Sequence, residues 1–218
     1  MIKIIALYLQ VFLLSINVTY SQNILSDSEP FKAGENLEYI VHYGIFNASY
    51  ASLKLTNVEL DGKDFLLASG YGKTIGLARL FFKVEDYYSS YFDDTDVTPY
   101  FFKRNIYEGG YTKNLEVKFN SEYQNATVNN LKNQTIETIN TEKNVQDLIS
   151  SLYYLRKNFS EEKVSIGEQF IINMFYDSKN RELPLIYLGK DIINTKFGKI
   201  ECLKFMPTTS KSRIFKGE

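Results

Sequence analysis

The sequence has one cysteine, one histidine and no tryptophan among its 218 residues. A single cysteine excludes an intrachain disulfide, and together with one histidine it leaves no His/Cys cluster of the kind that holds zinc. The chain also lacks an excess of either charge, because 25 Lys and Arg face 26 Asp and Glu, a formal net charge of −1. It therefore has neither the basic footprint of a nucleic-acid-binding protein nor the composition of a disordered charged chain. We expect no metal, no cofactor and no nucleic-acid partner.

Long apolar runs are few, and the one that stands out lies at the N-terminus. Lys3 precedes a run over residues 4–16 that is apolar with two exceptions, and small residues follow, with Ser21 at the −1 position if cleavage precedes Gln22. This order is that of a secretory signal. The run is shorter than the about 20 apolar residues of a transmembrane helix. We predict a signal peptide over residues 1–21, cleaved near Ser21, and no transmembrane span after cleavage.

The rest of the chain is predicted to be one exported domain. Residues 22–30 are polar and end in Pro30, which predicts a flexible lead-in, and residues 31–218 contain no repeat or linker. Eukaryotic secreted domains commonly have paired cysteines, whereas Cys202 is alone, so a bacterial envelope protein is the simpler interpretation. Cys202 lies in an apolar run and is predicted to be a buried, inert thiol.

Alternation of apolar and polar residues with a period of two dominates the domain and predicts strands. It is clearest over residues 111–120. Asp61-Gly62 and Gly109-Gly110 are hairpin signals between such segments. Strands are predicted over residues 36–43, 49–60, 63–71, 84–92, 100–108, 111–120, 123–129, 131–139, 168–176, 182–189 and 192–206.

Two segments depart from this rhythm. Residues 75–82 predict a short helix, and residues 144–159 predict an amphipathic helix with Asn144 and Asp147 in a capping arrangement. The apolar face of the second helix would contain Val145, Leu148, Ile149, Leu152, Leu155 and Phe159. The predicted fold class is mainly β, a large antiparallel meander that forms a curved half-barrel or barrel-like sheet, because flat sheets of this size are rare. The 17 Tyr and 16 Phe would fill its concave face, with the helix as a plug.

Charged residues on otherwise apolar strand faces indicate where a site would lie. If the strands over 84–92 and 100–108 pair around the intervening loop, Arg104 lies opposite about residue 88 and Asp86 lies on its diagonal. A buried arginine without a partner is costly. We therefore predict an Asp86–Arg104 ion pair, or a polar pocket lined by both.

Other motifs carry little chemistry. The segment from Gly70 to Thr74 ends like a phosphate-binding loop, but Leu67 stands where that motif requires glycine. His42 has no metal-ligand neighbour and no Ser or Cys in a nucleophile context, so no catalytic residue is assigned.

Several segments resemble, in order, those of one known family. They are Phe31–Tyr39, Gly72–Gly76, Phe82–Asp86, Pro99–Arg104, Glu108–Tyr111, Asp147–Arg156 and Thr195–Cys202. This ordered set is similar to the domain-of-unknown-function 3108 family of exported proteins from Gram-negative bacteria, over nearly all of residues 30–215. The resemblance implies a β-rich exported domain with no established activity and supplies no catalytic residues. Members of the family run on by several strands beyond the position of residues 213–215, so we expect the last strands to be missing here.

These observations predict a periplasmic, non-catalytic module that binds a lipid, a glycan or another envelope component such as an envelope protein. Its predicted polar anchors on the concave face are Lys73, Asp86, Arg104 and Glu108. Two other classes stay open. A hydrolase with paired carboxylates would need two of them about 5–9 Å apart. A structural role in envelope assembly would need a protein partner.

Overall fold

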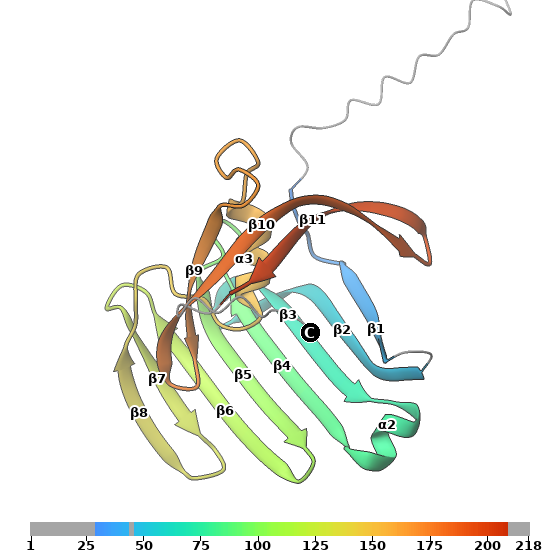
Figure 1. The fold of residues 1–218 in the computed structure, drawn as a ribbon. Helices are drawn as coiled ribbons and strands as arrows, with labels where there is room; N and C mark the ends of the chain where they lie inside the picture. Colours follow the sequence, from blue (N-terminus) through green and yellow to red (C-terminus); the bar gives the residue numbers. More distant parts are fainter. Residues whose placement is uncertain (1–28, 44–45, 209–218) are drawn as a thin grey trace, which may run out of the picture.

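The computed structural model describes residues 29–43 and 46–208, which form two antiparallel sheets and two short helices (Figure 1). The predicted signal peptide, most of the predicted lead-in and residues 209–218 lie outside the described residues. The large sheet is a meander of β1 (Asn36–Tyr43), β2 (Phe46–Leu60), β3 (Lys63–Thr74), β4 (Val84–Phe92), β5 (Pro99–Glu108), β6 (Tyr111–Asn120), β7 (Asn125–Asn130) and β8 (Thr135–Asn140). The second sheet has the order β11-β10-β9, from β9 (Gln169–Tyr176), β10 (Lys179–Thr195) and β11 (Gly198–Pro207). The helices are α2 (Gly76–Phe81) and α3 (Ser150–Asn158).

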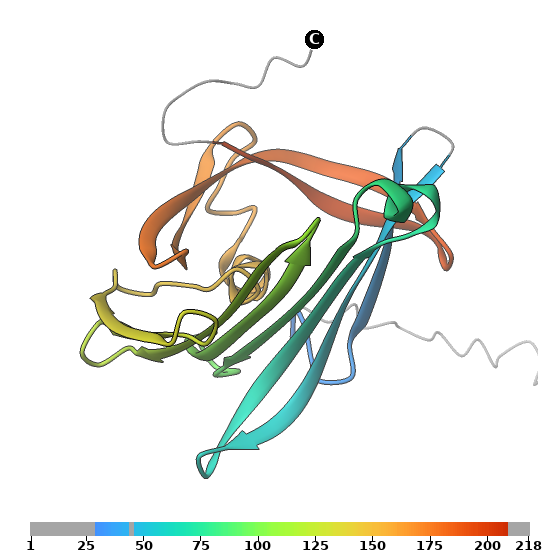
Figure 2. The same ribbon diagram turned by 90° about the horizontal axis from the view of Figure 1, so that it is seen from below.

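The mainly β fold and the curved antiparallel sheet are confirmed. The sheet is open, because each strand from β1 to β8 pairs only with its neighbours in sequence order, so it does not close into a barrel. After β8 the chain leaves the large sheet and builds a second one, which faces the first across α3 (Figures 1 and 2). No helix among the described residues has the length and hydropathy to cross a membrane.

The second sheet differs from the prediction at its hairpin. In place of the strands predicted over 182–189 and 192–206, the chain forms a longer β10 and a shorter β11, which turn at Thr195–Gly198 instead of near residue 190. Gly198 has a φ of +105°, and the Thr195 hydroxyl donates to its carbonyl at 2.9 Å, which closes the turn. The predicted break is a β-bulge around Gly189, at a φ of +88°, so the strand bends there without ending.

The helix predicted over 144–159 begins six residues late, at Ser150. The segment before it is extended, because Gln146 pairs with β9: its N–H donates to Asn173 and its carbonyl accepts from Phe175, both at 2.8 Å. Asp147 then turns the chain into the helix, with its carboxylate accepting from the N–H groups of Ile149 and Ser150 at 2.8 and 2.9 Å.

The predicted apolar face of this helix is wrong in part. Leu148 and Leu152 are 36% and 38% exposed, whereas Ser150, Ser151 and Tyr153 are buried. Because α3 begins at Ser150, Leu148 lies outside the helix, which contacts β4 of the large sheet and β9 of the second sheet and lies between the two sheets (Figure 2).

We call the face of the large sheet that packs against α3 and the second sheet the inner face. Two clusters of the core lie on it: one joins Phe31, Leu55 and Phe92 to Tyr153 of α3, and the other joins β6 and β7 to Phe175 of β9. The expectation that aromatic residues fill this face is only partly met. The register also places aromatic side chains on the opposite, outer face: Tyr50, Phe65, Tyr71, Tyr87, Tyr91, Phe101 and Tyr107.

Tyr153 allows the contribution of its ring packing to stability to be separated from that of its hydroxyl. Its side chain is fully buried against Phe31 and Phe92, at ring-centroid distances of 5.0 and 5.1 Å, and its hydroxyl has no hydrogen-bond partner within the described residues. Burial raises the pKa of this hydroxyl. An unpaired buried hydroxyl costs free energy, so Tyr153→Phe should raise the free energy of unfolding by about 1 kcal/mol in urea titrations. If Tyr153→Phe instead lowers the free energy of unfolding by the same amount, the Tyr153 hydroxyl has a hydrogen-bond partner.

Candidate functional site

Two inner-facing glycines of β3 mark the place where the cover of the inner face ends. A side chain added at Gly70 would meet Ile149, just before α3, and Tyr88, each at 3.4 Å. A side chain added at Gly72 would meet nothing within 4 Å. The inner face is therefore covered up to Gly70 and uncovered from Gly72 toward the strand ends beside α2. We call this second part the uncovered half.

Apolar side chains border the uncovered half on two sides. On β1, Tyr39 and Val41 share the inner face and are each 52% exposed. The ribbon of β10 and β11 passes opposite the large sheet and reaches β1 (Figure 2). Lys196 at the turn of that ribbon pairs with Glu38 of β1 at 3.2 Å. On β11, Ile200 is 43% exposed, so the ribbon also carries exposed apolar side chains.

Three of the four predicted site residues lie on this face. Arg104 is opposite Tyr88, and Asp86 is opposite Ile106, so Asp86 lies on the diagonal of Arg104 as predicted. Glu108 follows two positions after Ile106 on the same face. The sequence therefore placed these three charged groups on the correct face of the correct pair of strands.

The predicted Asp86–Arg104 ion pair is not formed. The Arg104 guanidinium donates to the Asp177 carboxylate at 2.8 Å and lies 4.7 Å above the ring of Tyr176. Lys113 of β6 pairs with the same carboxylate. Asp177 belongs to the turn between β9 and β10, 73 residues along the chain, so the second sheet supplies the partner that burial of Arg104 requires.

Asp86 and Glu108 are left as carboxylates without an ion pair among residues 29–43 and 46–208. Asp86 is 8% exposed and accepts a hydrogen bond from the N–H of Tyr107 at 3.2 Å. Burial raises the pKa of Asp86, and the negative charge of Glu108 adds to the rise against the opposing effects of the Tyr107 N–H and Arg104. These two groups form an acceptor-rich, negatively charged floor beside Gly72.

Lys73 does not join the other three. It pairs in register with Tyr50 and Glu85, which places its side chain on the outer face. Its ammonium lies 5.8 and 5.5 Å from the ring centroids of Tyr50 and Tyr71. A concave site containing all four predicted anchors is therefore not assembled, because neighbouring residues of one strand point to opposite faces.

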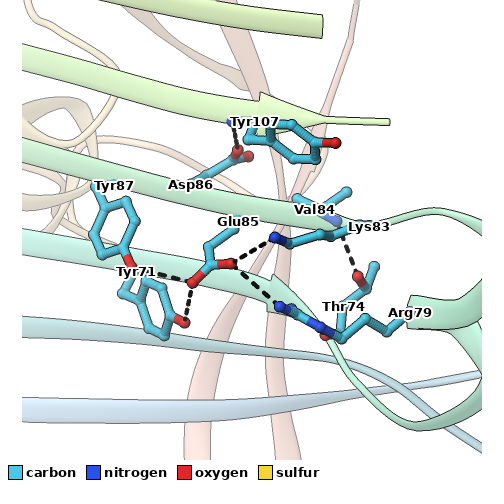
Figure 3. A network of polar contacts seen from close by, with 9 residues as sticks. All are labelled: Tyr71, Thr74, Arg79, Lys83, Val84, Glu85, Asp86, Tyr87 and Tyr107. Atoms are coloured by element: carbon cyan, nitrogen blue, oxygen red, sulfur yellow. Dashed lines mark hydrogen bonds and ion pairs between the residues drawn. The ribbon is translucent and has the colours of Figure 1, made fainter. Parts of the chain in front are cut away.

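Around Lys73 the outer face holds a separate polar network centred on Glu85 (Figure 3). One carboxylate oxygen accepts from the hydroxyls of Tyr71 and Tyr87 at 3.5 and 3.3 Å. The other lies 3.3 Å from the Arg79 guanidinium and 3.6 Å from the Lys83 ammonium. Arg79, through its hydrogen bond, is the main cause that lowers the pKa of Glu85.

Sequence reasoning missed several of these residues for physical reasons. Asp177 and Lys113 gain their role through a contact between two sheets, and neither has a local signal. Arg79 lies on the short helix that was predicted, but its partner depends on how α2 folds back on the outer face. Glu85 stood next to Asp86 in the sequence, and strand alternation alone would have placed it on the face opposite Asp86.

The fold and the site define a mainly β protein of two facing sheets with an uncovered, partly apolar inner surface. Residues 38–218 match the family described as "Protein of unknown function (DUF3108)", and the chain belongs to that family, as the resemblance predicted. No curated protein sequence matches the chain. Among solved structures it is similar to the crystal structure of a DUF1089 family protein from Pseudomonas aeruginosa, with 10% identity and a TM-score of 0.40, over 76% of this chain and 90% of that one.

Proposed function

We propose that this protein is a non-catalytic periplasmic module that binds an amphipathic, lipid-class ligand on the uncovered half of the inner face. The observation that carries the proposal is the open space above Gly72, between exposed apolar side chains and the carboxylate of Asp86. Exposed apolar surface next to a few convergent polar groups is typical of ligand sites. The N-terminal leader supports the compartment, because it has the pattern of a secretory signal.

The charges on this face determine which end of the ligand lies where. Arg104 and Lys113 share the one carboxylate of Asp177, so with Asp86 and Glu108 this face has two positive and three negative groups and a net negative charge. A head group that donates hydrogen bonds, through hydroxyl or ammonium groups, suits Glu108, which is more exposed than Asp86. The acyl part would pack against Tyr39, Val41 and the β10–β11 ribbon. The sugar of a glycolipid is such a hydroxyl-rich head group. A glycolipid would therefore combine the predicted lipid and glycan in one ligand.

A binding role is favoured over the hydrolase. The paired carboxylates that glycoside hydrolysis uses are present as Asp86 and Glu108, but Asp86 is largely buried and already accepts from the Tyr107 N–H. A catalytic acid must reach the leaving-group oxygen of its substrate. The envelope-assembly alternative would require a protein partner on the same surface, and the experiment below separates it from lipid binding.

The absence of tryptophan makes the proposal testable by fluorescence. We expect N-phenyl-1-naphthylamine, a neutral apolar probe, to quench the single tryptophan of a Tyr39→Trp variant when it binds the uncovered half. The matched control is Tyr107→Trp, which places the reporter on the outer face at a 38% exposed position. The tryptophan emission of the Tyr107→Trp variant should change several-fold less when the probe is added. A further change, Gly72→Leu, fills the open space and should weaken quenching in the Tyr39→Trp background.

Competition between two amphiphiles tests the head group. Dodecylammonium and dodecanoate have the same chain length and opposite charge, and we expect dodecylammonium to displace the probe at about tenfold lower concentration because the floor is acidic. Equal quenching of both tryptophans would contradict a site on the inner face. Absence of quenching at Tyr39→Trp would favour the assembly role.

A further inference from the structure

The outer face carries a second feature that the proposed lipid site does not use. A hollow of about 250 Å³ lies between α2 and the outer face of β3 and β4. Its lining residues are Tyr71, Lys73, Thr74, Ile75, Gly76, Arg79 and Glu85. Of the side chains in the Glu85 network of Figure 3, those of Tyr71, Arg79 and Glu85 itself line the hollow.

The charges of the hollow are unequal. Arg79 and Lys83 share the single carboxylate of Glu85, at 3.3 and 3.6 Å. Lys73 makes no ion pair with any of the residues that the structure describes, and its ammonium lies over the rings of Tyr50 and Tyr71. Three cations therefore meet one anion, and Lys73 keeps its donors available. An anionic group on a ligand would complete this arrangement.

The rest of the lining suits a polar ring more than a bare ion. Tyr71 lines the hollow, and its ring lies 4.9 Å from that of Tyr87 and 6.4 Å from that of Tyr50, two tyrosines that extend the aromatic surface beyond the hollow across three strands. Aromatic side chains with a hydroxyl present an apolar surface and a polar edge to the same ligand. The Tyr71 hydroxyl, which donates to Glu85, and the Thr74 carbonyl, which accepts from Arg79, keep acceptor lone pairs for hydroxyl groups of a ligand. The volume is below the roughly 300 Å³ at which sites for drug-sized ligands begin, so it suits about one small ring.

We infer that this hollow binds an acidic monosaccharide unit, with its carboxylate on Lys73 and its hydroxyls on the Tyr71 hydroxyl and the Thr74 carbonyl. Tight preorganisation supports this role, since the Glu85 carboxylate is held by four side chains before any ligand arrives. The inference is independent of the lipid site, which lies on the other face of the sheet and is tested with a different probe.

Saturation-transfer NMR on the folded chain tests the inference with D-glucuronate. D-Glucose serves as the ring without the charge, and inorganic phosphate as the charge without the ring. We expect transfer to glucuronate, at least tenfold weaker binding of glucose, and no displacement of glucuronate by equimolar phosphate. Equal binding of glucose and glucuronate would overturn the role of Lys73, and displacement by phosphate would reduce the hollow to a general anion site. No transfer to glucuronate would overturn the inference entirely.

A pair of lysine variants localises the effect. Lys73→Gln should weaken glucuronate binding about tenfold or more. Lys103→Gln is the matched control, because Lys103 also lies over an aromatic ring on the outer face, 5.2 Å from the centroid of Phe101, but does not line the hollow. The Lys103→Gln variant should bind glucuronate as tightly as the wild type does. Equal losses in both variants would show a diffuse charge effect and contradict the assigned site.

Discussion

Phe92→Ala should lower the free energy of unfolding by about 4 kcal/mol, because it removes a fully buried ring from the contact between the large sheet and α3. The Phe92 ring lies 5.1 Å from that of Tyr153 on the helix and 6.3 Å from that of Phe31, which precedes β1. Three segments distant in sequence meet at this side chain. The cavity left by alanine cannot close easily, because β2, β3, α3 and the segment before β1 surround it.

The matched control for this change is Phe101→Ala on the neighbouring strand. Phe101 points to the outer face, where it is only half-buried and lies 5.8 Å from the ring of Tyr91. We expect it to cost about 1 kcal/mol, since solvent can replace part of the lost contact. Urea unfolding followed by circular dichroism measures both values. A loss at Phe92 no larger than that at Phe101 would contradict a continuous core between the sheets.

Asp147→Asn should remove a pH dependence of stability that amounts to about 3 kcal/mol. Asp147 is fully buried, and burial raises the pKa of its carboxyl from 3.8 to about 6 despite hydrogen bonds from Ser90, Ile149 and Ser150. The native state therefore holds a proton that the unfolded chain releases. The resulting stabilisation is fully present below about pH 4 and is lost as the pH rises through about 6.

Asparagine keeps an acceptor for the N–H groups of Ile149 and Ser150 but does not titrate. We expect the wild type to gain stability relative to Asp147→Asn as the pH falls from 8 to 4, in urea unfolding measured across that range. Asp191→Asn is the control with the opposite sign, because a hydrogen bond from Lys204 lowers the pKa of that exposed carboxyl. A difference between wild type and Asp147→Asn that is independent of pH would show that the carboxyl titrates normally.

Local patterning was sufficient to predict the strands of the large sheet. Alternation of apolar and polar residues predicted β4 and β6 to the residue, and the register of β4 with β5 followed from the length of the loop between them. Asp61-Gly62 and Gly109-Gly110 marked two of the hairpins, because Gly and Asp are among the few residues that adopt the positive φ that such turns need. The faces of Asp86, Arg104 and Glu108 follow from the same period of two.

The second sheet and everything that depends on it were decided by tertiary structure. Asp147 ends an extended segment and starts α3 late because Gln146 pairs with β9, a contact between residues far apart in sequence. Arg104 chooses Asp177 over Asp86 because the β9–β10 turn folds back onto the inner face. Residue patterning thus determined the strands of the large sheet, their order and the faces of Asp86, Arg104 and Glu108, but not the hairpin of the second sheet or the face of Lys73. The packing of two sheets around one helix decided which charges meet, since burial forces each charge to find a partner wherever the chain supplies one.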